Sequence, residues 1–184
     1  MNFLRLLKYS LSAAAIIMLL LSGCTGGNDR ESTKGAGIVD ISDQEKRIPE
    51  FNLSSPIPEE PVTSSEALEG KVVLVTFFAS WCRSCLEEIP LLIKLQNRFS
   101  DQGFSLIAMA IDHENKIGLK NLIQKWNINY PVLLADESVK KDFGGIAILP
   151  TMFLVDREGK LLKKYSGHIK RESLVQDIKQ NLNR

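Results

Sequence analysis

Hydrophobic residues along the chain occur in two patterns, continuous runs and helically spaced positions. Residues 72–79 and 104–111 are nearly unbroken apolar runs, which are typical of strands covered on both faces of a sheet. Residues 82–99 and 119–126 instead carry apolar side chains at mostly helical spacing, which predicts two amphipathic helices. Residues 132–134 form a short apolar stretch that we expect to be extended.

The last third of the chain predicts a hairpin followed by a helix. Two strands, at residues 152–155 and 161–165, are separated by the turn sequence Asp-Arg-Glu-Gly. A terminal helix follows, with apolar positions at Leu174, Ile178 and Leu182. The order of elements is β-α-β-α-β-β-α, which predicts an α/β fold with a mixed central sheet flanked by helices on both faces.

The N-terminal residues have the pattern of an export signal. Arg5 and Lys8 precede an apolar stretch at residues 11–21, and a helix of this length rises only about 16 Å, against about 30 Å for a hydrocarbon core. The tetrapeptide Leu-Ser-Gly-Cys that ends at Cys24 resembles the lipobox of bacterial lipoproteins, which implies cleavage before Cys24 and lipidation of its side chain. A marginal membrane anchor without cleavage is the alternative.

These patterns divide the chain into three parts. We expect a signal peptide at residues 1–23, a lipidated cysteine and flexible linker at residues 24–48, and a folded domain at residues 49–184. The linker, rich in glycine and charged residues, would span roughly 27 Å. The domain is therefore expected to be extracytoplasmic and lipid-anchored, on the periplasmic side of a membrane or on the outer face of the cell membrane.

Composition excludes several classes of function. The 184 residues include 23 Lys and Arg and 22 Asp and Glu, so the formal net charge is +1 and nothing indicates a nucleic-acid partner. Three cysteines are too few for a disulfide-stapled scaffold or for a zinc site of several thiolates. Lipidation of Cys24 would account for the odd cysteine and leave the other two as a pair.

That pair carries the main chemical signal of the sequence. Cys82 and Cys85 fall where the first buried strand gives way to a helix, and free N–H groups at a helix N-terminus stabilise a thiolate. The spacing places Cys85 one turn into the helix, close enough to form a disulfide with Cys82. Arg83 adds positive charge beside Cys82, which favours the thiolate and a more oxidising couple. We predict a dithiol built for exchange.

Two other uses of these cysteines are open from the residues alone. A purely structural disulfide closing about four residues would constrain the unfolded chain by only roughly 2 kcal/mol. A metal site is the second alternative, and His113 and His168 are the only histidines in the sequence. Zinc would require two further ligands, whereas copper needs fewer, and Cys82, Cys85 and His168 would suffice.

Several motifs occur together and in order across the predicted domain: Gly70-Lys71-Val72-Val73-Leu74-Val75, Trp81-Cys82-x-x-Cys85, Glu88, Pro90, and Leu149-Pro150-Thr151 followed by Phe153-Leu154-Val155. By these motifs, residues 49–184 resemble the thioredoxin superfamily, specifically its membrane-tethered, extracytoplasmic ResA/TlpA-like branch. The resemblance implies a thioredoxin fold with a four- or five-stranded sheet and thiol–disulfide oxidoreductase activity. It implies no cofactor and no metal, because two sulfurs carry both electrons.

The resemblance also assigns roles to individual residues. Cys82 corresponds to the nucleophile and Cys85 to the resolving thiol. Pro150 corresponds to a cis-proline beside the dithiol, since an X–Pro bond tolerates the cis form at only about 0.5–1 kcal/mol. A cis bond there would leave the backbone of Leu149 free to pair with a substrate strand, and Thr151 follows in the same segment. A trans edge-strand proline is the alternative.

Glu88 resembles the acidic residue that tunes the cysteine pair in ResA-like proteins. Thioredoxin itself has a buried Asp at the position of Thr76, so Glu88 is the local carboxylate expected to exchange a proton with Cys85. A surface helix glutamate is the alternative, and we expect Glu87 to be solvated. Trp81 is expected to shield the disulfide and contact a partner, or else to be a structural aromatic.

The partners implied by the resemblance are protein disulfide substrates and an upstream membrane thiol reductant. Apocytochrome c is one such substrate, although Thr151 stands where thioredoxins dedicated to cytochrome maturation often carry Glu. Reduction of substrates is the expected direction, and an antioxidant role would follow from the same chemistry. The charge of Arg83 keeps open the alternative of a dithiol that acts as an oxidant.

Overall fold

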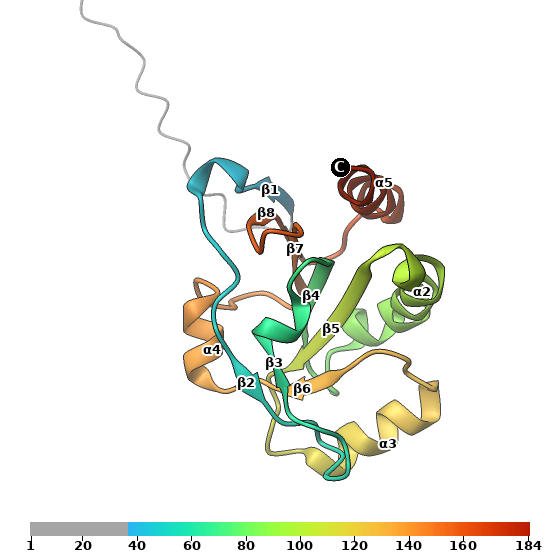
Figure 1. Cartoon of the computed structure of the whole chain (residues 1–184). Helices are drawn as coiled ribbons and strands as arrows, with labels where there is room; N and C mark the ends of the chain where they lie inside the picture. Colours follow the sequence, from blue (N-terminus) through green and yellow to red (C-terminus); the bar gives the residue numbers. More distant parts are fainter. Residues whose placement is uncertain (1–36) are drawn as a thin grey trace, which may run out of the picture. The chain divides into compact units, whose positions relative to one another are not determined.

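A six-stranded mixed sheet forms the centre of the computed structural model, which describes residues 37–184 (Figure 1). The strands lie in the order β1-β8-β7-β4-β5-β6. Three of them are parallel, and β7, β8 and β1 continue the sheet as antiparallel neighbours. Their bounds are β1 Gly37–Asp40, β4 Val72–Phe78, β5 Phe104–Ala110, β6 Val132–Leu134, β7 Thr151–Val155 and β8 Leu161–Ser166.

Strand β4 shows why its sequence has no polar–apolar alternation. Alternate side chains of a strand point to opposite faces, and here both faces are covered. Val72 and Leu74 pack in one core with α2 and α5, whereas Val73, Val75 and Phe77 pack in a second core on the other face. The predicted α/β fold, with a mixed sheet covered on both faces, is therefore confirmed.

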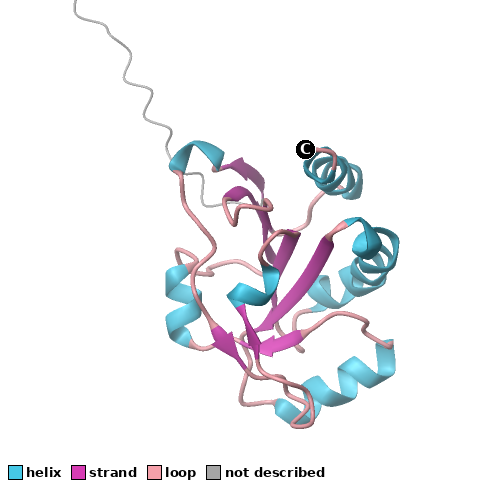
Figure 2. Cartoon of the chain, viewed as in Figure 1, coloured by secondary structure: helices cyan, strands magenta, loops and turns pink. Residues whose placement is uncertain are grey.

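Within residues 37–184, four α-helices lie around the sheet (Figure 2). Helices α2, α3 and α5 contribute buried side chains to the first core, and α4 contributes to the second. Three of the helices begin at a residue whose side chain accepts a backbone N–H, which stabilises the first turn. Their bounds are α2 Arg83–Phe99, α3 Lys116–Trp126, α4 Glu137–Asp142 and α5 Arg171–Leu182.

The sheet has six strands and not the expected four or five, because part of the predicted linker folds. Strand β1 pairs with β8, with Ile38 opposite Tyr165, and Ile41 is buried just after it. An exposed edge strand of four residues has too little apolar pattern to be recognised, since its partner strand supplies the pairing. Residues 37–48 therefore belong to the folded unit. The predicted signal peptide and Cys24 lie outside the described residues.

Three short elements were also absent from the prediction. Strands β2 (Asn52–Leu53) and β3 (Thr63–Ser64) form a separate two-stranded sheet, and α4 lies between β6 and β7. Such elements are too short to show a period, and α4 depends on the Asp136 side chain, which accepts the Val139 N–H at 2.9 Å. Among residues 37–184, no helix has the length and apolar character needed to cross a membrane.

Candidate active site

Cys82 and Cys85 lie at the start of α2 and form a disulfide, with their Cα atoms 5.3 Å apart. Cys82 is the N-cap residue, and its sulfur accepts the backbone N–H of Cys85 at 3.3 Å. Leu86 in turn donates its N–H to the Cys82 carbonyl at 3.1 Å. The helix terminus therefore directs an N–H group at the Cys82 sulfur, an arrangement that stabilises a thiolate there once the bond is reduced.

The side chains that flank Cys82 in the sequence are exposed to solvent, whereas Cys85 is buried. Trp81 is 70% exposed, so it is not a core aromatic and presents its ring to solvent next to Cys82. Arg83 points to solvent as well, and its Nε pairs with Glu87 Oε1 at 3.1 Å. That ion pair, together with solvent, screens the positive charge expected to act on Cys82. Cys85 is 3% exposed and lies below this surface.

A network that the sequence did not reveal holds the loop before Cys82. Asp112, in the loop after β5, accepts hydrogen bonds from the Ser80 N–H at 3.0 Å and from the Ser80 hydroxyl. Asn115 donates to the same hydroxyl at 3.1 Å and also caps α3. A polar residue directly after a buried strand was the available signal. The network fixes the turn that delivers Trp81 and Cys82 to the helix.

The segment 149–151 lies beside the dithiol, as expected. The Leu149–Pro150 peptide bond is cis, and Pro150 lines the same small cavity as Cys85. Within the described part of the chain, neither the N–H nor the C=O of Leu149 has a backbone hydrogen-bond partner. Thr151 begins β7, and its hydroxyl donates to the Ile148 carbonyl at 2.7 Å. The structure thus brings Cys82, Cys85 and this segment together.

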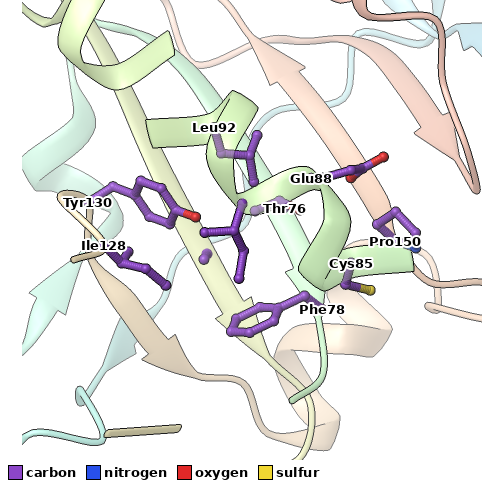
Figure 3. Close-up of a pocket in the computed structure, with 10 residues that line it drawn as sticks. Thr76, Phe78, Cys85, Glu88, Leu92, Ile128, Tyr130 and Pro150 are labelled. Atoms are coloured by element: carbon purple, nitrogen blue, oxygen red, sulfur yellow. The ribbon is translucent and has the colours of Figure 1, made fainter. Parts of the chain in front are cut away.

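Glu88 is buried one turn after Cys85 and is not a surface glutamate. The residue is 9% exposed, and Oε2 has no hydrogen-bond partner among the described residues. Figure 3 shows its carboxyl group on the side of α2 that faces Pro150, away from Tyr130. Burial raises the pKa of Glu88 to about 7, while the positive charge of Arg171 opposes this shift. A carboxyl group with that pKa exchanges protons readily near neutral pH.

Two cavities meet at Glu88. The first, of about 10 Å³, lies under the dithiol and is walled mainly by apolar side chains and by Thr76, Cys85 and Tyr130. Burial raises the pKa of Tyr130 well above its usual value, so it stays protonated. The second cavity, of about 70 Å³, lies on the α5 side of α2, where His168 and Arg171 line it.

The expected metal alternatives have no assembled site in the region that the structure describes. Across residues 37–184, no group of three or more His, Cys, Asp or Glu side chains is arranged to hold a metal ion. His168 lines the second cavity with Glu88, whereas Cys82 does not. His113 lies in the loop after β5, where its Nε2 is 3.2 Å from Glu114. Cys82 and Cys85 are joined to each other in a disulfide.

Comparison with known proteins identifies the family. The Redoxin family model matches residues 43–182. The chain belongs to the Redoxin family. It is 30% identical to the thiol-disulfide oxidoreductase ResA of Bacillus thuringiensis (strain Al Hakam) over 91% of this chain and 94% of that protein. It is also 25% identical to the thioredoxin-like protein YneN of Bacillus subtilis (strain 168), over 90% and 95% of the two chains.

A solved structure of a similar protein agrees with the fold. The crystal structure of a thiol:disulfide interchange protein of the thioredoxin family from Chlorobium tepidum TLS superposes with a TM-score of 0.69 at 29% identity. The match covers 75% of this chain and 97% of that one. Together with the disulfide at the start of α2, membership of the Redoxin family makes this protein a thiol–disulfide oxidoreductase whose redox-active pair is Cys82 and Cys85.

Proposed function

We propose that this protein is an extracytoplasmic, membrane-tethered reductase of protein disulfides. The observation that carries the proposal is the burial of Glu88 one turn after Cys85, where both residues line the same small cavity. A resolving thiol must lose its proton before it attacks, and Glu88 is placed to take that proton. Cys82 is 7% exposed and lies at the helix start beside exposed Trp81, and we propose that its sulfur is the one that meets the substrate.

The reaction we propose has two exchange steps. The Cys82 thiolate attacks one sulfur of a substrate disulfide, forms a mixed disulfide and releases the other substrate sulfur as a thiolate. Cys85 then transfers its proton to the Glu88 carboxylate and attacks the Cys82 sulfur, which releases the second substrate thiolate. The product is a reduced substrate and the Cys82–Cys85 disulfide. A membrane thiol reductant restores the dithiol with two electrons, so no cofactor is required.

Substrate contacts are proposed for the residues that border the dithiol. Trp81 offers an exposed aromatic surface, and Leu149 offers unpaired backbone groups to an extended peptide. Pro150 and Thr151 hold that segment beside Cys85. These contacts suit protein disulfides in extended segments, and apocytochrome c is one such substrate.

The proposed location, at a membrane outside the cytoplasm, follows from the sequence at the start of the chain. The basic and apolar start of the chain, followed by Leu-Ser-Gly-Cys, supports a signal peptide at residues 1–23 and a lipid on Cys24. Two or three acyl chains hold a domain firmly at a membrane, whereas one does not. Cys24→Ala should release the protein from the membrane fraction with its redox activity intact, and membrane retention of that variant would refute the anchor.

The direction of electron flow is tested by the redox state of the pair in the native host. Acid-quenched cells are treated with a mass-tagged maleimide, which labels the Cys82–Cys85 dithiol but not the disulfide. A reductase should be found mostly as the dithiol. Removal of the membrane thiol reductant that supplies its electrons should convert it to the disulfide. A pair that is mostly disulfide during normal growth would mean that the protein acts as an oxidant.

The substrates are tested with Cys85→Ser, which stops the reaction at the mixed disulfide. This variant should accumulate dithiothreitol-sensitive complexes through Cys82. The matched control, Cys82→Ser with Cys85→Ser, should accumulate none. Equal complexes from the control would show that the trapped proteins do not react at Cys82.

A further inference from the structure

Among the described residues, Glu88 alone lines both the small cavity under the dithiol and the larger cavity between α2 and α5. Its Oε2 is buried without a partner, so nothing in the described residues directly relays its proton. A proton that arrives from Cys85 must leave again before the next turnover. We compare the two cavities as routes by which this proton can reach solvent.

The cavity under the dithiol is a poor exit. At about 10 Å³ it is at the lower limit for one water molecule, and apolar side chains make most of its wall. It also lies behind Cys85 and Pro150, which a bound substrate covers under the function proposed above. During the mixed-disulfide stage, this side of Glu88 is therefore closed to solvent.

The cavity between α2 and α5 has the opposite character. Its volume of about 70 Å³ is several times the 10–15 Å³ that one water requires. Its wall is formed by Glu88 and Glu87, by the apolar side chains of Leu91, Met152 and Ile169, and by His168 and Arg171. His168 and Glu87 are both exposed, so the cavity reaches solvent at its rim.

The charged and titratable groups that face Glu88 from each neighbouring element favour this route. Helix α2 contributes Glu87, the loop before α5 contributes His168, and α5 contributes Arg171, whereas β7 contributes only uncharged side chains. Across the smaller cavity lies Tyr130. Of these groups, His168 is an exposed imidazole at the cavity wall, and an imidazole can take up a proton at one ring nitrogen and release one from the other.

We propose that the cavity between α2 and α5 is the proton port of Glu88, and that His168 at its wall relays the proton to solvent. The inference rests on the proposed role of Glu88 as acceptor of the Cys85 proton. In each cycle one proton moves from the Cys85 thiol to the Glu88 carboxylate and then through this cavity to bulk water. Arg171, facing the same cavity, favours the ionised form and so promotes the second transfer.

The test separates the two exchange steps. Reduced protein mixed with an aromatic disulfide such as dithionitrobenzoate releases one coloured thiolate when Cys82 reacts and a second when Cys85 resolves the mixed disulfide. Leu91→Trp fills the cavity, and His168→Gln removes the relay at an exposed position. Both should slow the second release by about threefold to tenfold, less than direct loss of a general base, and leave the first within about twofold.

Rescue and a matched control distinguish a relay from a change of structure. Imidazole in the buffer should restore the second phase of His168→Gln, because it replaces the lost proton carrier. His113→Gln changes the other histidine, outside the cavity, and should leave both phases unchanged. If Leu91→Trp does not fold, His168→Gln with imidazole decides the question alone.

Glu88→Gln separates this inference from the proposed function. If that variant resolves the mixed disulfide at the wild-type rate, Glu88 is not the proton acceptor. The proposed role of Glu88 and the proposed proton route are then both refuted. If it is slow while folded His168→Gln and Leu91→Trp resolve normally, the acceptor role stands and the port is refuted. Slow resolution in all three variants, with imidazole rescue of His168→Gln only, is the expected result.

Discussion

Glu88 and Asp177 are two carboxylates that are buried to the same degree and used differently. Their residues are 9% and 8% exposed, respectively. Asp177 accepts a hydrogen bond from Lys163 Nζ at 2.6 Å and another from the Tyr165 hydroxyl at 2.8 Å, so α5 is fastened to β8. Glu88 has a buried oxygen with no partner and lies at the dithiol.

The difference shows how the molecule separates stability from reactivity. A buried carboxylate that is paired and hydrogen-bonded holds two elements together and keeps its charge. A buried carboxyl group without a partner destabilises its own ionised form, and the raised pKa is the sign of that cost. Of the two groups, Asp177 is held by two donors, whereas Glu88 has an unpartnered oxygen and a raised pKa.

The largest expected effect on stability comes from removing the Asp177 carboxylate. Asp177→Ala leaves the Lys163 ammonium and the Tyr165 hydroxyl without their shared acceptor, and both are at least partly buried. We expect the free energy of unfolding to fall by about 3 kcal/mol, measured by urea denaturation of the oxidised protein. The rates of both thiol-exchange steps should stay at wild-type values. A loss below about 1 kcal/mol would mean that this pair behaves like an exposed ion pair.

The opposite change is expected at the unpaired site, and it depends on pH. The pKa of Glu88 is raised from 4.5 to about 7 in the folded protein, so between these values the folded state binds more protons than the unfolded state. Stability contributed by the protonated form is therefore complete below pH 4.5 and is lost as pH rises through 7. Glu88→Gln has no such loss, because its side chain stays neutral.

Oxidised Glu88→Gln should therefore be more stable than the wild type at pH 8, by roughly 1–3 kcal/mol, and equal to it near pH 4. Urea denaturation at a series of pH values measures the gap. Glu87→Gln, the same change at the exposed neighbouring residue, is the control and should show no pH-dependent gap. Equal stability of Glu88→Gln and wild type at every pH would show that burial does not perturb this carboxyl group.

The contrast between the two carboxylates also marks how far the sequence could predict the molecule. The buried strands β4 and β5, helix α2 and the position of Cys82 at its start follow from apolar period and local spacing. The inward direction of Glu88 follows from its place one turn after Cys85. Such features depend on residues close together in the chain, so a single sequence reveals them.

Partnerships between distant elements were not predictable in the same way. The hydrogen bonds to Asp177 come from β8, more than ten residues earlier in the chain. The hydrogen bond between Ser80 and Asp112 joins residues that are 32 positions apart. His168 reaches the Glu88 cavity from a loop 80 positions away in sequence numbering. Strand β1 was missed for the same reason, because it is ordered by β8. Only the assembled sheet brings these groups together.

The smallest effect is expected at Arg83, an exposed charge beside the reactive sulfur. Its side chain is 93% exposed and is already paired with Glu87, so solvent and the ion pair both weaken its influence on Cys82. Arg83→Gln should raise the pKa of the Cys82 thiol by a few tenths at low salt, and by nothing detectable at about 1 M salt, where the Debye length is near 3 Å.

The pH dependence of Cys82 alkylation, measured at both salt concentrations, gives this pKa directly. The double variant Arg83→Gln with Glu87→Gln removes both members of the pair and should return the low-salt value toward that of the wild type, because most of the change comes from uncovering the negative charge of Glu87. A rise of a full pKa unit that persists at high salt would contradict this account. It would make Arg83, and not the N–H group at the start of α2, the main stabiliser of the thiolate.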